Sequence, residues 1–186
     1  MVEVSREPFM RIVLAAASAA VIAAAGAARA EVVESQPHGF QVKSTVEIAA
    51  KPDAVWRALT RDVSRWWDPA HTWSGDAKNL SIRAKPGGCF CEKMPNGGGV
   101  QHMTVNYVSV NQGLHMTGQL GPLHLQGAGG GLLFDLKPSD QGTTLTLTYT
   151  VGGFAAGGLK KWEKPVDGVL TNQLQRLERY VETGKP

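Results

Sequence analysis

The side chains best suited to proton transfer lie on two strand candidates in the middle of the chain. Residues 89–94 and 100–110 are separated by Asn96-Gly97-Gly98-Gly99, which is typical of a hairpin turn. A hairpin that turns about the first of these glycines places Glu92 opposite His102. A carboxylate beside an imidazole can act as a general acid and base. With a phenol farther along the second strand, the candidate catalytic residues are Glu92, His102 and Tyr107.

The same register directs Glu92 and His102 outward, where a solvated ion pair contributes little to stability. A slip of one residue in the hairpin register would instead bring Cys91 opposite His102, and a thiolate beside an imidazole could provide two metal ligands. Two thiols and one imidazole leave a tetrahedral metal site one ligand short, so we expect no metal. Nothing in the sequence indicates another cofactor, because it has no phosphate-binding loop and no nucleophile elbow.

Cys89 and Cys91 are the only two cysteines. Two residues apart on a regular strand, their α-carbons are about 6.6 Å apart, near the outer limit for a disulfide. We therefore expect no bridge between them. In the favoured register the two thiols lie on the apolar side of the hairpin, opposite Met103 and Val105, as small buried residues.

These residues must be positioned by a β-sheet, and the middle of the chain has the residue alternation that is typical of β-strands. Apolar and polar residues alternate most clearly from Thr143 to Val151, which indicates a strand with one buried and one wet face. Gly127-Ala128-Gly129-Gly130-Gly131 is interpreted as a flexible turn or bulge between strands. The strand candidates in this region are residues 80–84, 89–94, 100–110, 114–120, 132–136 and 143–151.

Helical patterns flank the sheet. A first strand over Phe40–Ile48 is followed by Lys51-Pro52-Asp53, which is typical of a helix start, and by two short helices at most. Val166 to Val181 repeats apolar residues every three or four positions, so it predicts a long amphipathic helix whose partner is the apolar face of the sheet. The predicted fold is α+β: a helix-grip fold, with a curved antiparallel sheet of about seven strands around a C-terminal helix.

Four segments in this order resemble the START-like superfamily, also called SRPBCC. They are Pro52–Thr60, Gly87–Glu92, Gly142–Tyr149 and Val166–Tyr180. Within the superfamily, the similarity is greatest to the branch of polyketide cyclases and heat-shock ATPase-activator homologues. The resemblance covers most of residues 39–183, and Glu92 matches the acidic position of the family's Gly-Gly-x-aromatic-x-Glu stretch.

The resemblance implies a cavity between the sheet and the C-terminal helix that holds a small hydrophobic or aromatic molecule. An apolar wall with a few polar groups is the chemistry such a cavity needs. Side-chain parity predicts one set of wall residues. Four tryptophans, Trp66, Trp67, Trp73 and Trp162, lie in segments expected near the cavity mouth and are a second set. The candidate ligand-binding residues are Trp66, Trp67, Trp73, Met103, Val105, Tyr107, Met116, Phe134, Leu147 and Tyr149.

Two other functions stay open on the same resemblance. One is an enzyme similar to polyketide cyclases, aromatases or dehydratases that uses the cavity as its active site. The other is a module that binds a protein partner, as the ATPase activators do. No catalytic signature decides whether the chain is an enzyme. Nucleic acid is not an expected partner, because the net charge is only +3 and no basic run exceeds Lys160-Lys161.

The N-terminal 30 residues are typical of a secretory signal peptide. An apolar run from Ile12 to Ala28 follows Met10-Arg11 and ends at Ala28-Arg29-Ala30, a small-x-small cleavage pattern, and translation from either Met1 or Met10 fits it. Cleavage after Ala30 leaves no membrane span and predicts a periplasmic or secreted protein. The expected organisation is a signal peptide (1–30), a short linker (31–38), one START-like domain (39–183) and a tail (184–186).

Overall fold

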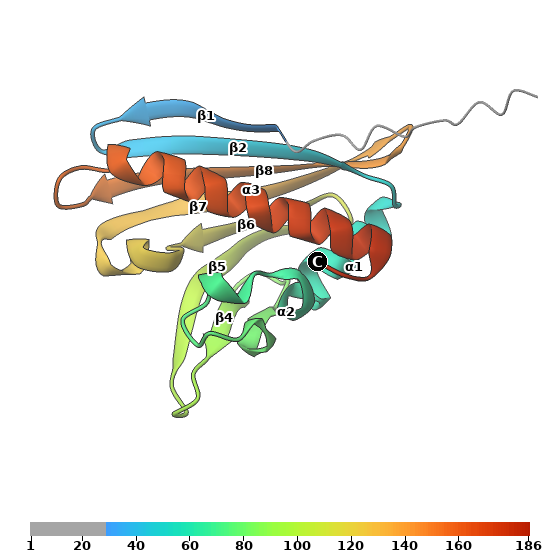
Figure 1. Cartoon of the computed structure of the whole chain (residues 1–186), viewed down its shortest axis with the longest axis horizontal. Coiled ribbons are helices and arrows are strands. Elements are labelled where there is room, and N and C mark those ends of the chain that lie inside the picture. The colour runs from blue at the N-terminus through green and yellow to red at the C-terminus, as the bar shows by residue number, and fades with distance from the viewer. Residues whose placement is uncertain (1–28) are drawn as a thin grey trace, which may run out of the picture.

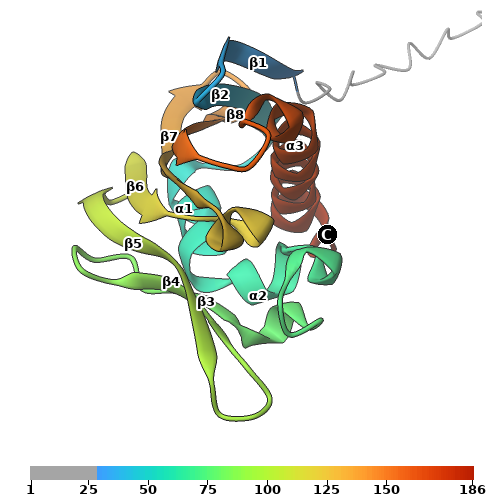
Figure 2. The same cartoon turned by 90° about the vertical axis from the view of Figure 1, so that its left-hand side faces the viewer.

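The structure is a computed structural model that describes residues 29–186. One antiparallel sheet of eight strands, in the order β1-β2-β8-β7-β6-β5-β4-β3, curves around a long helix (Figures 1 and 2). The strands are β1 (Arg29–Gln36), β2 (Gly39–Ile48), β3 (Leu80–Ile82), β4 (Cys89–Lys93), β5 (Gly99–Ser109), β6 (Gly113–Gly118), β7 (Gly127–Ser139) and β8 (Gly142–Phe154). The helix-grip prediction is confirmed, with eight strands where about seven were expected.

The additional strand is β1, at the edge of the sheet. Its residues 31–36 fall in the segment expected to be a linker, and the strand pairs with β2 from Arg29↔Thr45 to Gln36↔Gly39. The sequence pattern hides it because a shift in register between Val32 and Glu34 breaks the alternation of period two. Val32 packs against the core, whereas Val33 is largely exposed.

The glycine-rich segment is a strand and not a flexible turn. Residues 127–131 form the first part of β7 and pair with β8 from Gly127↔Phe154 onward. A Cβ atom on Gly130 would overlap the carbonyl oxygen of Thr150, so the close approach of the two backbones requires glycine there. The glycines therefore serve strand packing in this region.

Two bulges in β5 decide which of its side chains face the helix. One lies opposite the step from Phe90 to Cys91, where His102 is the extra residue on β5, and the other lies between Val105 and Tyr107. A bulge reverses side-chain parity beyond it. Consecutive residues His102 and Met103 are thus both buried, while Tyr107 is 57% exposed.

Short helices follow β2 and close one end of the molecule. They are α1 (Pro52–Arg61), α2 (Val63–Trp66), η1 (Pro69–His71) and η2 (Ala77–Asn79), while η3 (Gly121–Leu125) connects β6 and β7. Proline stands in the first turn of α1, as its lack of a donor N–H allows. Capping oxygens of Asp68 and Asp76 accept from backbone N–H groups at the starts of η1 and η2.

The C-terminal helix α3 (Lys160–Thr183) crosses the concave face of the sheet (Figure 1). It begins six residues before the predicted start, and Pro165 lies inside it. Leu170, Leu174 and Leu177 are buried against the sheet, and the left-handed Gly184 ends the helix with its N–H bonded to the Tyr180 carbonyl. The amphipathic stripe predicted from the sequence therefore packs where it was expected.

Candidate functional site

A cavity of about 650 Å³ lies beside the N-terminal half of α3. That volume is in the range of pockets that enclose a small organic molecule. Four parts of the chain build it: residues 67–73, the inner face of β3–β5, the segment 120–125 and the first turns of α3. Its apolar wall includes Trp67, Leu80, Phe90, Leu125, Trp162 and Leu170. Trp73 and Leu125, which are 41% and 73% exposed, also line it.

The structure divides the predicted ligand-binding residues into three groups. Trp67 and Trp73 line the cavity. Tyr107 lies on the outer face, because of the bulge before it. The others are core residues at most 3% exposed and do not line the cavity: Trp66, Met103, Val105, Met116, Phe134, Leu147 and Tyr149. These core residues are therefore closed off where the cavity was expected, and the hollow lies beside the N-terminal half of α3.

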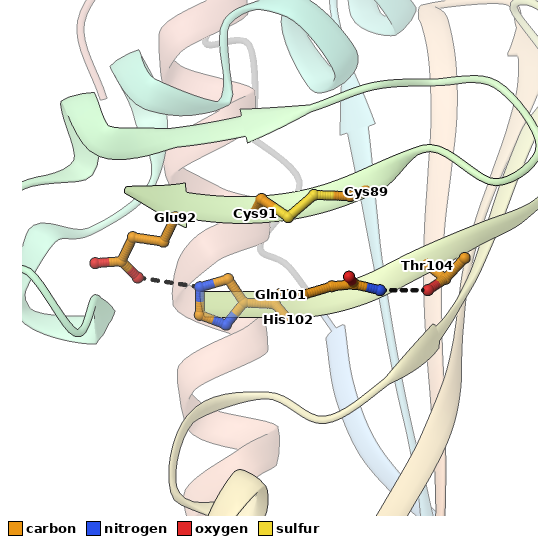
Figure 3. Close-up of a disulfide and its surroundings, with 6 residues drawn as sticks. All are labelled: Cys89, Cys91, Glu92, Gln101, His102 and Thr104. Carbon is orange, nitrogen blue, oxygen red and sulfur yellow. Dashed lines mark hydrogen bonds and ion pairs between the residues drawn. A yellow bond between two sulfur atoms is a disulfide. The ribbon is translucent and has the colours of Figure 1, made fainter. Parts of the chain in front are cut away.

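Glu92 is buried and has a complete set of hydrogen-bond donors. Its Oε2 accepts from the backbone N–H of Trp73, at 3.1 Å, and its Oε1 accepts from the N–H of Ser74. The same Oε2 lies 3.0 Å from Nε2 of His102 (Figure 3). Glu92 therefore ties β4, β5 and the cavity-lining segment 67–73 together.

The predicted pairing of Glu92 with His102 is present, but its predicted outward direction is wrong. Glu92 is 2% exposed and His102 4% exposed, and His102 lines the cavity. The hairpin pairs Glu92 with Val100, and the bulge at His102 turns the imidazole inward. The expected solvated surface pair is instead a buried pair, in which Glu92 is the hydrogen-bond partner of the His102 side chain.

The charge state of the pair follows from its surroundings. Burial opposes ionisation of Glu92, but hydrogen bonds from Ser74, Trp73 and His102 outweigh it and lower the pKa of the carboxyl. Burial also lowers the pKa of His102, against the opposing influence of Glu92 and with a further contribution from His124. At neutral pH Glu92 is thus an anion and His102 is neutral. An anion only accepts, so Nε2 of His102 carries the proton and donates it to Glu92.

The neutral imidazole then has a free acceptor. Nδ1 of His102 carries the lone pair, is buried and has no hydrogen-bond partner among the described residues. Figure 3 shows it on the side of the ring away from Glu92. On α3, the buried Nε1 of Trp162 is a donor that also has no partner there, and Trp162 lines the same cavity. Both atoms have almost no accessible surface, so they lie beneath the cavity wall and do not face its open space.

Cys89 and Cys91 are joined in a disulfide, contrary to the prediction from strand geometry (Figure 3). Their α-carbons are 5.4 Å apart, well within reach of a bridge. The regular rise assumed from the sequence does not apply at this step, where the register between β4 and β5 shifts. The cysteines alternate with buried Phe90 and Glu92, so the disulfide lies on the other face of β4 and not in the apolar wall.

Several cavity residues were not predicted from the sequence. They come from the segment 120–125, which contains Leu120, Pro122 and Leu125, and from the start of α3, which contains Pro165 and Val166. A signal for the first group was present, since an apolar loop between two strands is unusual on a protein surface. The helix residues lie before or at the predicted helix start, where no periodicity marked them.

Within residues 29–186 no group of three potential metal-ligating side chains occurs, and no helix is long and apolar enough to cross a membrane.

Residues 39–182 match the family of polyketide cyclases and dehydrases and lipid-transport proteins. The chain belongs to this family. No curated protein matches its sequence. The match covers every element from β2 through α3 and thus includes all the walls of the cavity.

Solved structures share the fold of this family member at low sequence identity. The Aha1 dimer from Colwellia psychrerythraea is 18% identical over 78% of this chain and 98% of its own, with a TM-score of 0.55. DynU16, a protein from the dynemicin biosynthetic locus, is 22% identical over 78% of this chain and 48% of its own, with a TM-score of 0.53. An uncharacterised Rhizobium leguminosarum protein is 15% identical over 83% and 97%, with a TM-score of 0.56. These likenesses concern the fold.

Proposed function

We propose that this protein is exported and binds a small hydrophobic or aromatic molecule in the cavity beside α3. The observation that carries the proposal is a hollow of about 650 Å³ walled mainly by aromatic and aliphatic side chains. Aromatic walls bind flat apolar molecules through large contact areas with specific ring geometry. Trp67 and Phe90 already stand edge to face in the wall, with ring centroids 5.3 Å apart.

The cavity wall is held in place without a ligand. Segment 67–73 is attached to β4 through Glu92 and to α3 through the bond from the Asp68 N–H to Gln173 Oε1, at 2.8 Å. The indole N–H of Trp67 donates to the carbonyl of His71 at 3.0 Å, which fixes the ring. A wall that is already ordered loses little entropy on binding, and this favours affinity.

Two observations support export. The apolar run from Ile12 to Ala28 and the Ala28-Arg29-Ala30 sequence have the pattern of a cleaved signal peptide. The Cys89–Cys91 disulfide is the form expected of cysteines in an oxidising compartment. Expression of the full chain in a bacterial host tests this: a periplasmic product whose mass begins at Glu31 supports export, and an uncleaved cytoplasmic product contradicts it.

The binding proposal is tested by titrating the purified chain with 2-methoxynaphthalene and following tryptophan fluorescence. We expect saturable quenching with one site per chain. Val169→Trp places a large ring in the cavity and should abolish binding, whereas Leu133→Trp adds the same ring on the outer side of β7 and should not. Equal binding by the two variants would contradict the cavity as the site.

A second function, that of a cyclase-type enzyme, is favoured by the Glu92–His102 pair in the cavity wall. A neutral imidazole oriented by a carboxylate is a competent general base. In this function the His102 ring would have to turn Nδ1 toward the cavity to remove a proton from a bound substrate, and Glu92 would stabilise the imidazolium that forms. Incubation of the wild type and His102→Phe with a linear poly-β-ketone tests it: cyclised product formed only by the wild type supports the enzyme, and equal product from both contradicts it.

A further inference from the structure

We propose that the Cys89–Cys91 disulfide is a redox-active site that oxidises peptide dithiols by thiol–disulfide exchange. This inference goes beyond the proposed function, because the disulfide lies on the outer face of β4 and the cavity lies on the inner face. In this site Cys91 is the sulfur that a substrate thiolate attacks, and Cys89 is the sulfur that leaves as a thiolate. Arg83 stabilises that leaving thiolate.

The first part of the argument concerns access to the two sulfurs. Cys89 and Cys91 are half-buried, whereas the residues that alternate with them, Phe90 and Glu92, are 2% exposed. Ser81, which pairs with Cys91 from β3, is itself exposed. In Figure 2 the helices lie on the concave side of the sheet, away from this face. The disulfide is therefore open to a thiolate, in contrast to a bridge enclosed in a core.

The second part concerns charge around the disulfide. The stretch from β3 to β5 contains one carboxylate, that of Glu92, which is buried on the other face. Its exposed cations are Arg83, Lys85 and Lys93. The N–H of Arg83 donates to the carbonyl of Cys89 at 3.0 Å, which continues the pairing of β3 with β4 and places the two residues opposite each other. Opposite residues of antiparallel strands share a face, and a neighbouring cation stabilises a thiolate.

The third part concerns what the bridge contributes to the fold. It closes a loop of only three residues, and so short a loop restricts the unfolded chain little. The residue of β4 that belongs to the hydrophobic core is Phe90, on the other face. Beside the bridge, on β5, the amide of Gln101 donates to the hydroxyl of Thr104 at 2.7 Å (Figure 3). Opening the bridge therefore leaves the core and the neighbouring strand intact, as a disulfide that opens and closes requires.

The exchange takes place in two steps. The thiolate of a substrate cysteine attacks Sγ of Cys91, and a mixed disulfide forms as the bond to Cys89 breaks and Cys89 leaves as a thiolate. The second thiolate of the substrate then attacks the substrate sulfur of the mixed disulfide, which releases Cys91. The substrate dithiol loses two electrons and two protons and becomes a disulfide, and the cysteine pair gains both and becomes a dithiol.

The experiment incubates the purified, oxidised protein at pH 7 with a synthetic peptide that contains two reduced cysteines separated by two glycines. Mass spectrometry should detect one oxidised peptide for each pair of protein thiols that forms. The second-order rate constant should be at least about tenfold larger than that of glutathione disulfide with the same peptide, because a cation stabilises the leaving thiolate. This measurement needs no variant.

Matched variants assign the effect to one cation. Arg83→Gln should lower the rate constant about three- to tenfold. Lys43→Gln, which removes an exposed cation from β2, should leave it unchanged. In the reduced wild type, brief treatment with iodoacetamide should alkylate Cys89 before Cys91, and Arg83→Gln should remove this order. A merely structural contribution of Arg83 would change stability but not the order of alkylation.

The outcomes distinguish this site from the cavity. A rate constant no larger than that of glutathione disulfide, a bridge that the peptide does not open, or equal alkylation of the two cysteines in the wild type would overturn the inference. None of these results bears on the binding of 2-methoxynaphthalene, which probes the cavity. Failure of that compound to bind would instead refute the proposed function and leave the redox site unaffected.

Discussion

The two ends of the concave face show opposite ways of completing a helix-grip fold. At one end, Leu147 and Met116 are no more than 1% exposed and belong to a closed apolar core. At the other, Leu125 and Trp73 are exposed and line a hollow that His102 and Trp162 also line. The same sheet thus contributes to stability where its side chains form the closed core. It leaves room for a ligand where loop segments form the opposite wall.

The largest expected effect is on stability at the packed end. Leu147→Ala removes a fully buried side chain and should lower the free energy of unfolding by about 2–5 kcal/mol. Leu125→Ala removes the same atoms at the mouth of the cavity and should change it by less than about 0.5 kcal/mol. Urea denaturation measures both. Similar losses in the two variants would mean that the two ends do not differ in packing.

The next effect concerns the buried Glu92–His102 pair beside the cavity. Glu92→Gln removes the buried charge that receives three hydrogen bonds and should cost about 1.5–3 kcal/mol. Asp135→Asn makes the same chemical change at the exposed ion pair with Lys137, whose charged atoms are 3.1 Å apart, and should be near neutral. Equal unfolding free energies for the two variants would show that burial of Glu92 contributes nothing.

A smaller effect is expected at the disulfide. It closes a loop of only three residues, so the chain-entropy relation gives a stabilisation of about 1.5 kcal/mol. Cys89→Ser combined with Cys91→Ser should lower the unfolding free energy by that amount, and chemical reduction of the wild type should do the same. Two free thiols in the unreduced protein, detected by a thiol reagent, would contradict the bridge.

The smallest effect is the response of stability to mild acid. The pKa of His102 is lowered by burial, against the attraction of Glu92 and with the aid of His124, so the unfolded chain binds this proton more tightly than the folded chain. Stability is therefore fully present above pH 6.5, the ordinary value, and falls as the pH drops through the folded pKa. The pKa of Glu92 is also lowered, by the hydrogen bonds that outweigh its burial. The protein therefore loses further stability as the pH falls below 4.5, the ordinary value of a glutamate. His102→Phe should flatten the fall between pH 7 and 5, and an unchanged slope would contradict this assignment.

The architecture was predictable because it depends on patterns that repeat over many residues. The alternation from Thr143 to Val151 and the stripe of α3 hold whatever happens at single positions. The site depends on single positions. One extra residue at His102 turned the predicted surface pair inward, and another before Tyr107 moved a predicted wall residue outside. Bulges have no strong sequence signature here, so the pairing of Glu92 with His102 was predictable, but the face on which they meet was not. The donors Trp73 and Ser74 were not predicted.

The position of the cavity was unpredictable for a related reason. Periodicity shows that Phe134 and Tyr149 point to the buried face of the sheet. It does not show how far the helix lies from that face. The cavity is bounded by segments without periodicity, namely residues 67–73 and 120–125, which line it together with the first turns of α3. Tertiary contacts of loops therefore decide where the binding space lies, while strand parity decides only which residues are buried.

The most direct test of the cavity as a ligand site is the position of a bound probe. Nuclear Overhauser contacts should be measured between 2-naphthol and the methyl groups of the chain. We expect contacts to Leu125 and Leu170, which line the cavity, and none to Met116 or Leu147, which do not. Contacts to the packed-core methyl groups, or to none of the four, would contradict the account.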